Sequence, residues 1–215
     1  MESISEIVDA LSVGAWLIHA SLVLIAAVYV LYRYNRSKLR QALYWGFGLV
    51  SSGIAYAIAF GYRASLIEET ITVQTVQETF LSLAIALFYY ACASTVTRNR
   101  IYSTFLVCVI LVLEVAIIGY FNLILNEYPV GFSVITVFFA LPVSLLVALF
   151  FTVDYLSLRR RASLLIALSF WFELVLGPLF LAVSRTSLEW VYSFGGAANA
   201  LLLFAGFLLL ARSNR

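Results

Sequence analysis

The chain has 215 residues, of which 64% are hydrophobic, 16% aromatic and only 11% charged, and its formal net charge is +2. Soluble domains carry about 45–50% apolar and about 25% charged residues, so this composition is that of a membrane protein and excludes a separate soluble catalytic or nucleic-acid-binding domain. One histidine and two cysteines, both cysteines within apolar runs, exclude a disulfide framework and argue against a Cys/His zinc site or a haem with two histidine ligands.

Seven apolar runs, bounded by charged or turn residues, follow one another along the chain. They cover residues 11–32, 41–62, 78–97, 101–122, 130–153, 162–183 and 189–211. A membrane-crossing helix needs roughly 20 apolar residues, and backbone exposed to lipid must satisfy its own hydrogen bonds, so these runs predict helices rather than barrel strands. We therefore expect an all-α integral membrane protein with seven transmembrane helices in one domain, 1–215, whose longest connection is a loop over 64–77.

The positively charged residues divide unevenly between the two sides of the predicted membrane. When the tails and loops are assigned alternately to the two sides, one side receives eleven Lys and Arg residues and the other receives two, Arg63 and Arg185. The eleven are Arg33, Arg36, Lys38, Arg40, Arg98, Arg100, Arg159, Arg160, Arg161, Arg212 and Arg215. Short loops rich in Lys and Arg face the cytoplasm, so we expect a multi-pass plasma-membrane protein with its N-terminus outside and its C-terminus cytoplasmic. One lysine against twelve arginines, with short loops, favours a prokaryotic source.

The first three and the last three spans carry similar short motifs in the same order. Val13-Gly14 corresponds to Val130-Gly131 at an offset of 117 residues, and three further motif pairs recur at offsets of 115 to 122 residues. A duplication with small insertions gives such nearly constant offsets. We therefore expect parallel repeats over 11–100 and 130–215, joined by helix 101–122 in a 3+1+3 arrangement.

Seven helices in this order, with the N-terminus outside and at this chain length, resemble the broad group that contains microbial rhodopsins and SWEET-type sugar transporters. The resemblance covers the whole chain as topology and implies a rhodopsin-like bundle. The end of the last span, 208–213, is similar to the rhodopsin terminus, and Glu78 and Ser82 resemble the acid and the hydroxyl four residues apart in the third rhodopsin helix. In the SWEET pattern, Asn199 corresponds to one member of an asparagine pair.

A retinal cofactor is excluded by the position of the lysine. In rhodopsins a lysine of the last helix forms the Schiff base with retinal, and aligning this chain on Arg212 places Leu203 at that position. The only lysine in the chain is Lys38, in a predicted cytoplasmic loop. The sequence therefore predicts no cofactor.

Three ionisable side chains lie deep within the predicted spans: His19, Glu114 and Glu173. An ionisable residue at the centre of a membrane helix costs about 2.5–3.5 kcal/mol on insertion scales and is a functional candidate by default. With a helical rise of about 1.5 Å per residue, all three side chains fall close to one depth, and Asn199 of the last span lies in the same layer.

Helical spacing predicts that these polar residues face the interior of the bundle. Glu78 and Ser82 share one face of the third span, and Glu173 and Asn199 lie in polar stripes of the sixth and seventh spans. Trp171 is the one tryptophan near the predicted midplane. Together these residues predict a cavity with an aromatic wall, open mainly to the outside.

The buried ionisable groups and the expected repeat predict transport of protons or a small solute through a pathway centred on His19, Glu114 and Glu173. A carboxyl in a low dielectric favours its neutral form, so it can pass a proton, and the same groups suit a cationic or hydroxyl-rich ligand. Two alternatives remain: a sensor or receptor module that signals through a protein partner, and an accessory subunit of a larger membrane complex or homo-oligomer. No Ser, Cys or His arrangement has catalytic spacing, so we expect no enzyme. The expected partners are the lipid bilayer and a small solute or protons, and not nucleic acid.

Overall fold

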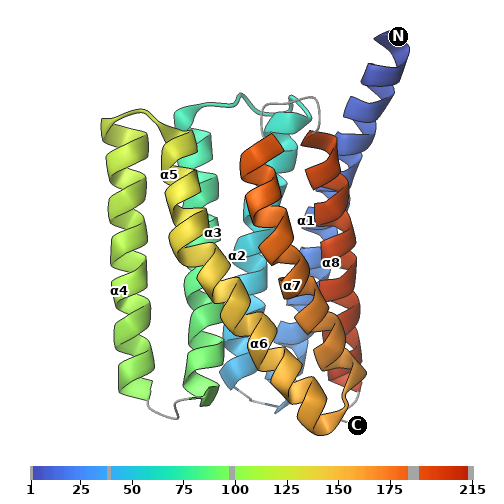
Figure 1. Ribbon diagram of the computed structural model, residues 1–215, viewed down its shortest axis with the longest axis vertical. Coiled ribbons are helices and arrows are strands. Elements are labelled where there is room, and N and C mark those ends of the chain that lie inside the picture. The colour runs from blue at the N-terminus through green and yellow to red at the C-terminus, as the bar shows by residue number, and fades with distance from the viewer. Residues whose placement is uncertain (1, 38–39, 97–99, 184–188, 213–215) are drawn as a thin grey trace.

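A computed structural model of the chain describes residues 2–37, 40–96, 100–183 and 189–212, and these residues form a bundle of helices (Figure 1). The elements are α1 (Glu2–Ser37), α2 (Arg40–Arg63), α3 (Ile71–Val96), α4 (Arg100–Ile118), the π-helical η1 (Gly119–Ile124), α5 (Tyr128–Ile135), the π-helical η2 (Thr136–Ala140), α6 (Leu141–Leu158), α7 (Arg161–Val183) and α8 (Glu189–Arg212). Within the described residues, seven helical stretches are long and apolar enough to cross a membrane, which confirms the predicted number of spans. One stretch joins α4 to η1, and another joins α5, η2 and α6.

The helices are arranged as a ring with one helix outside it. α1 packs against α2 and α8, α2 also packs against α3, and α7 packs against α6 and α8. Contacts between α3 and α6 close the ring. α4 packs mainly against α3 and α5, so it lies at the edge of the bundle (Figure 1). The ring encloses the space in which a site inside the membrane can form.

The third span begins earlier than the apolar pattern indicates, at Ile71 rather than at residue 78. The Thr70 hydroxyl accepts a hydrogen bond from the Val73 N–H at 3.3 Å, which caps the start of the helix. The polar residues of the first two turns include Gln77, whose side chain is buried inside the bundle. The predicted loop over 64–77 is therefore too long, because residues 71–77 are helical and Gln77 faces the interior.

The fifth span contains a widened helical turn next to a proline. In η2 the Leu141 N–H donates to the carbonyl of Thr136, five residues earlier. Pro142 follows directly, and a proline ring crowds the carbonyl of the residue four positions before it. The π-helical turn widens the helix at this point and relieves that crowding. η1 forms a second π-helical segment at the end of the fourth span.

Five aromatic side chains fill the centre of the helix bundle, toward the end at which α1 ends and α2 begins. The Trp45 ring lies 5.2 Å from Phe88, 5.5 Å from Phe151, 5.8 Å from Phe207 and 6.4 Å from Phe170, measured between ring centroids. These residues, here called the aromatic plug, come from α2, α3, α6, α7 and α8. Buried aromatic pairs at such distances contribute about 0.5–1.5 kcal/mol beyond their buried area, so the plug ties the five helices together.

Glycine permits a close helix approach between α1 and α2. A Cβ added at Gly53 would lie 2.6 Å from the Leu24 side chain, and a Cβ at Gly46 would similarly overlap Leu31. Small residues allow such approaches in membranes, where helix association depends on van der Waals packing.

Replacing Gly53 by valine should therefore destabilise the bundle by about 1–3 kcal/mol, the usual cost of overpacking. The measurement is the thermal unfolding midpoint of the purified protein in detergent, which should fall in Gly53→Val. Gly14→Ala is the control, since a Cβ at Gly14 meets nothing within 4 Å. Equal midpoints for Gly53→Val and the wild type would contradict the close packing of α1 on α2.

Candidate functional site

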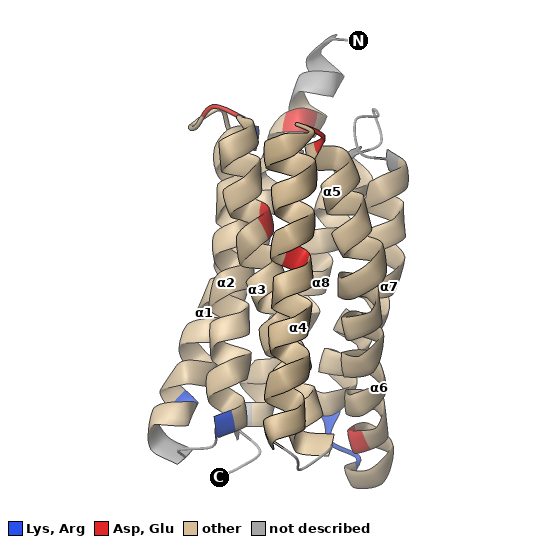
Figure 2. Ribbon diagram, turned by 90° about the vertical axis from the view of Figure 1, so that its left-hand side faces the viewer, with Lys and Arg blue, Asp and Glu red and all other residues tan. Residues whose placement is uncertain are grey.

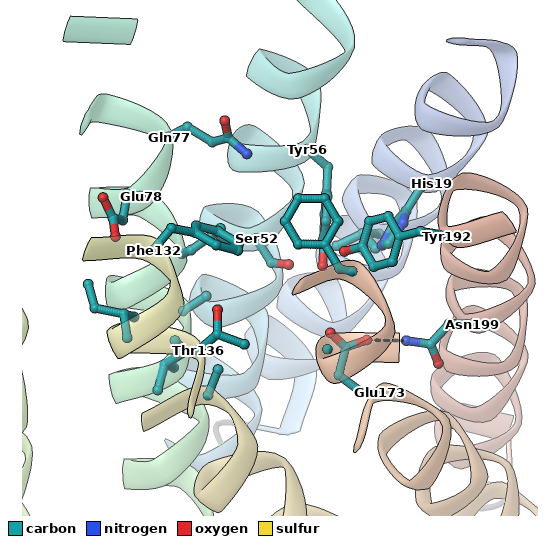
Figure 3. Close-up of a pocket in the computed structure, with 18 of the residues that line it drawn as sticks. His19, Ser52, Tyr56, Gln77, Glu78, Phe132, Thr136, Glu173, Tyr192 and Asn199 are labelled. Carbon is teal, nitrogen blue, oxygen red and sulfur yellow. Dashed lines mark hydrogen bonds between the residues drawn. The ribbon is translucent and has the colours of Figure 1, made fainter. Parts of the chain in front are cut away.

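A cavity of about 460 Å³ lies inside the ring, lined by residues of α1, α2, α3, α5, η2, α6, α7 and α8 (Figure 3). At one end its lining includes Arg63, Glu69 and Tyr128, which lie at or beside the connections at the end of the bundle where α1 begins. At the other end it includes Phe88 and Phe170, both members of the aromatic plug. The cavity thus extends from one end of the bundle toward the centre and stops at the plug.

Glu173 of α7 is held at the cavity by an oriented chain of hydrogen bonds. The Asn199 amide of α8 donates to Glu173 Oε2 at 2.7 Å, and the Ser169 hydroxyl donates to Asn199 Oδ1 at 2.7 Å. Because an amide donates through nitrogen and accepts through oxygen, this chain fixes the orientation of the Asn199 side chain. The Glu173 carboxyl consequently has a defined position at the cavity wall (Figure 3).

The wall around Glu173 is aromatic. Tyr56 of α2 and Tyr192 of α8 lie next to each other near Glu173, and both interact with it electrostatically (Figure 3). The Trp16 ring of α1 lies 6.1 Å from Tyr56 and 5.7 Å from Tyr192. Phe180 of α7 continues the wall 4.5 Å from Tyr192. The cavity wall near the carboxyl group is therefore formed by four aromatic residues.

His19 of α1 belongs to the same wall. Its ring lies 3.7 Å from Tyr56 and stacks on Trp16 at 6.5 Å with an interplanar angle of 10°. Gly196 of α8 provides the space for it, since a Cβ at Gly196 would lie 2.8 Å from His19 Nδ1. The imidazole is thus wedged among two aromatic rings and the backbone of α8.

The charged residues of the lining are mostly acidic. Among the described residues that line the cavity, Glu69, Glu78 and Glu173 are acidic, and Arg63 is the one arginine. Glu78 lies on the α3 side, across the cavity from Glu173 (Figure 3). A cavity with several carboxyl groups and aromatic walls has the chemistry that binds cations, through charge and through the negative faces of the rings.

The structure brings four of the six sequence-predicted site residues to this cavity: His19, Glu78, Glu173 and Asn199. Two others lie elsewhere. Glu114 is on α4, outside the ring, and does not line the cavity. Trp171 does not form the expected aromatic wall, because its side chain is 39% exposed on the outer face of α7 and its indole N–H donates to the Thr152 hydroxyl at 3.1 Å.

Sequence reasoning missed the aromatic residues that do form the wall, above all Trp16 and Tyr56. Trp16 precedes His19 by three residues, and this spacing places both on one helix face. Tyr56 follows Ser52 by four residues, and the two side chains hydrogen-bond to each other at the cavity. The pairs Trp16–His19 and Ser52–Tyr56, each at helical spacing, were therefore the signal in the sequence that could have predicted this wall.

In the part of the chain that the structure describes, no group of three or more His, Cys, Asp or Glu residues is arranged to hold a metal ion. His19 is the only histidine of the chain, so its role at the cavity has to be argued from its aromatic and polar neighbours.

No protein-family model, curated protein or solved structure matches this chain. The fold and the cavity therefore describe the class of protein: it is a multi-pass membrane protein with an acidic, aromatic cavity inside its ring of helices. Since unrelated functions occur on similar folds, the function has to be argued from the site.

The cavity should admit a small cationic thiol reagent. In a protein lacking Cys92 and Cys108, Ser52→Cys places a thiol at the cavity, whereas Ala59→Cys places one at a fully buried position of the same helix outside the lining. We expect ethylammonium methanethiosulfonate to label Ser52→Cys much faster than Ala59→Cys, measured by mass spectrometry. Similar slow labelling at both positions would show that the cavity is closed to such reagents.

Proposed function

We propose that the protein binds a small organic cation in the cavity and transports it across the membrane. The observation that supports this most directly is the Glu173 carboxyl, which is fixed by Asn199 and lies near Tyr56 and Tyr192, whose rings pack on Trp16. A carboxylate supplies the counter-charge for an amine or quaternary ammonium group, and aromatic faces bind the same group through cation–π interactions of about 0.5–2 kcal/mol each.

The cost of placing these groups in a membrane supports a function rather than a structural role. Glu173 and His19 lie well inside helices that are long and apolar enough to span a bilayer. Structural hydrogen bonds between membrane helices contribute only about 0.6 kcal/mol on average. An apolar residue in place of Glu173 would hold α7 against α8 as well, without the cost of a buried carboxyl.

Transport requires that the cavity open alternately to the two sides. The aromatic plug separates the cavity from the end of the bundle where α1 and α2 connect, so one opening exists and the second would require the plug helices to move apart. Repeat-built transporters place their substrate site between the two halves, near the midplane. The predicted parallel 3+1+3 repeat and the resemblance to SWEET-type transporters and microbial rhodopsins fit this proposal as topology.

Proton movement is part of the same proposal. His19 and Glu173 are both proton-binding groups at the cavity, and Tyr56 lies between them as a hydroxyl that can relay a proton. The proposed pathway runs through these three residues rather than through Glu114. Uptake of a cation against release of a proton would keep the charge inside the cavity balanced.

A sensor is the second candidate, and the aromatic plug is the observation that favours it. A ligand cavity that is permanently closed at one end binds without transport and passes its signal through helix movement to a partner. The transporter and the sensor would bind the same kind of ligand, and they differ only in whether the ligand crosses the membrane.

Glu173→Gln should weaken the binding of a small quaternary ammonium ion such as tetramethylammonium or choline. The amide keeps the shape of the side chain and removes its charge, so affinity should fall at least about tenfold, equivalent to about 1.4 kcal/mol. Binding is measured by isothermal titration calorimetry in detergent. Glu68→Gln is the matched control, since Glu68 is exposed and does not line the cavity. If tetramethylammonium and choline do not bind the wild type, or bind Glu173→Gln equally well, the organic-cation proposal fails.

The same proteins in liposomes separate transport from sensing. The wild type should take up radiolabelled choline and move protons, measured with an internal pH dye, and Glu173→Gln should do neither. Binding without uptake of choline would favour the sensor.

We also propose that the end of the bundle bearing the cavity opening faces the outside. Figure 2 shows basic residues gathered at the opposite end, where Lys- and Arg-rich loops face the cytoplasm in plasma-membrane proteins. In intact cells, a membrane-impermeant thiol reagent should label Glu68→Cys in the α2–α3 connection and not Arg160→Cys before α7. Labelling of Arg160→Cys alone would reverse the orientation.

A further inference from the structure

A second cluster of polar side chains lies between α3, α4 and η1. Among the described residues, five buried side-chain oxygen or nitrogen atoms have no hydrogen-bond partner: Glu78 Oε1, Ser82 Oγ, Glu114 Oε1, Glu114 Oε2 and Asn122 Oδ1. All five are oxygens. The four residues that carry them are at most 2% exposed.

These atoms belong to one place in the fold. The Asn122 amide of η1 donates to Glu78 Oε2 at 2.6 Å, and Ser82 lies one helical turn after Glu78 on the same face of α3. Glu114 interacts electrostatically with Glu78 across the packed pair of α3 and α4. Figure 2 shows acidic segments on both helices away from the ends of the bundle. Glu78 is thus the common neighbour of the other three residues.

The unsatisfied atoms are almost all pure acceptors. The Asn122 nitrogen is used by Glu78 Oε2 and by the Thr75 hydroxyl at 3.3 Å, so its Oδ1 is left as an acceptor without a donor. The two carboxyls bring further acceptor oxygens and, when ionised, two negative charges in a buried place. A buried charge or acceptor without a partner is unfavourable, and a positively charged ligand among these oxygens supplies that partner when the carboxyls are ionised.

The chemistry of the ligand follows from the donor set. Carboxylate, amide and hydroxyl oxygens, with no nitrogen or sulfur, are the ligands that hard cations such as Ca²⁺ prefer. Two carboxylates balance the charge of one divalent ion. Gly131 of α5 faces the same place without a side chain, and a Cβ there would lie 2.9 Å from Asn122 Oδ1.

We infer that Glu78, Ser82, Glu114 and Asn122 bind a hard cation, Ca²⁺ by charge balance, between α3 and the peripheral α4. Glu78 also lines the cavity, so the ion reaches the site from the cavity side. The site does not depend on the proposed transport of an organic cation, because Glu114 and Asn122 do not line the cavity. The ion would join α4 to the ring of helices.

The test is the thermal unfolding midpoint of the protein in detergent, after treatment with a chelator, with CaCl₂, MgCl₂ or NaCl added at constant ionic strength. CaCl₂ should raise the midpoint of the wild type, with NaCl the weaker alternative ligand. Glu114→Gln and Glu78→Gln should each abolish the rise. Radioactive ⁴⁵Ca²⁺ binding by equilibrium dialysis measures the ion directly and should be lost in the same two variants.

Three controls separate this site from the cavity. Glu173→Gln should keep the full response to CaCl₂ while binding choline more weakly, and Glu68→Gln should behave as the wild type in both assays. In Glu114→Gln the new amide supplies a donor where the ion would lie, so this variant should fold in chelator without the ion. Failure of CaCl₂ and NaCl to stabilise or bind the wild type, or a response that survives in both Glu78→Gln and Glu114→Gln, overturns the inference.

Discussion

Inside a bilayer no water is present to bond a polar group, so every buried donor, acceptor and charge of this protein must find its partner within the bundle. The helical backbone meets this requirement by itself. The side chains meet it unequally: Ser169, Asn199 and Glu173 form a completed chain of hydrogen bonds, whereas the carboxyls of Glu78 and Glu114 retain oxygens without donors. The two proposed sites follow from this difference: Glu173, already held by Asn199, is proposed to bind a solute in the cavity, and Glu78 and Glu114, with unpartnered oxygens, are proposed to bind a metal cation.

The arrangement of the helices separates these two roles. The ring encloses the cavity with every helix except α4, and the aromatic plug, which joins five helices, closes one end of it. α4 takes no part in this wall. It contributes Glu114 instead, on the one helix face that turns toward α3.

The sequence was sufficient to predict the seven spans, because apolar runs of this length have no other stable state in a chain of this composition. It also indicated the depth at which His19, Glu114 and Glu173 lie, since depth follows from helical rise alone. It could not give the direction in which each side chain points around its helix. For Glu114, most neighbours on α4 are apolar on every side, so no polar stripe marks the inner face. Trp171 was chosen by its depth, although it lies two residues from both Ser169 and Glu173, about 200° around the helix from the polar stripe of its span. The position of α4 outside the ring depends on tertiary packing, which no local pattern encodes.

The π-helical turn η2 determines how the fifth span would respond to a change in its number of residues. A π-helical turn holds one residue more than an α-helical turn, so η2 changes the angular phase between the residues before it and those after Pro142. Deleting a single residue within 136–140 would restore regular α-helical phase and rotate the preceding half of the span by about 100° around its axis. Phe132 would then turn away from the interior while the half after Pro142 kept its packing. The extra residue therefore sets, independently of the rest of the bundle, which side chains this span presents to a bound molecule.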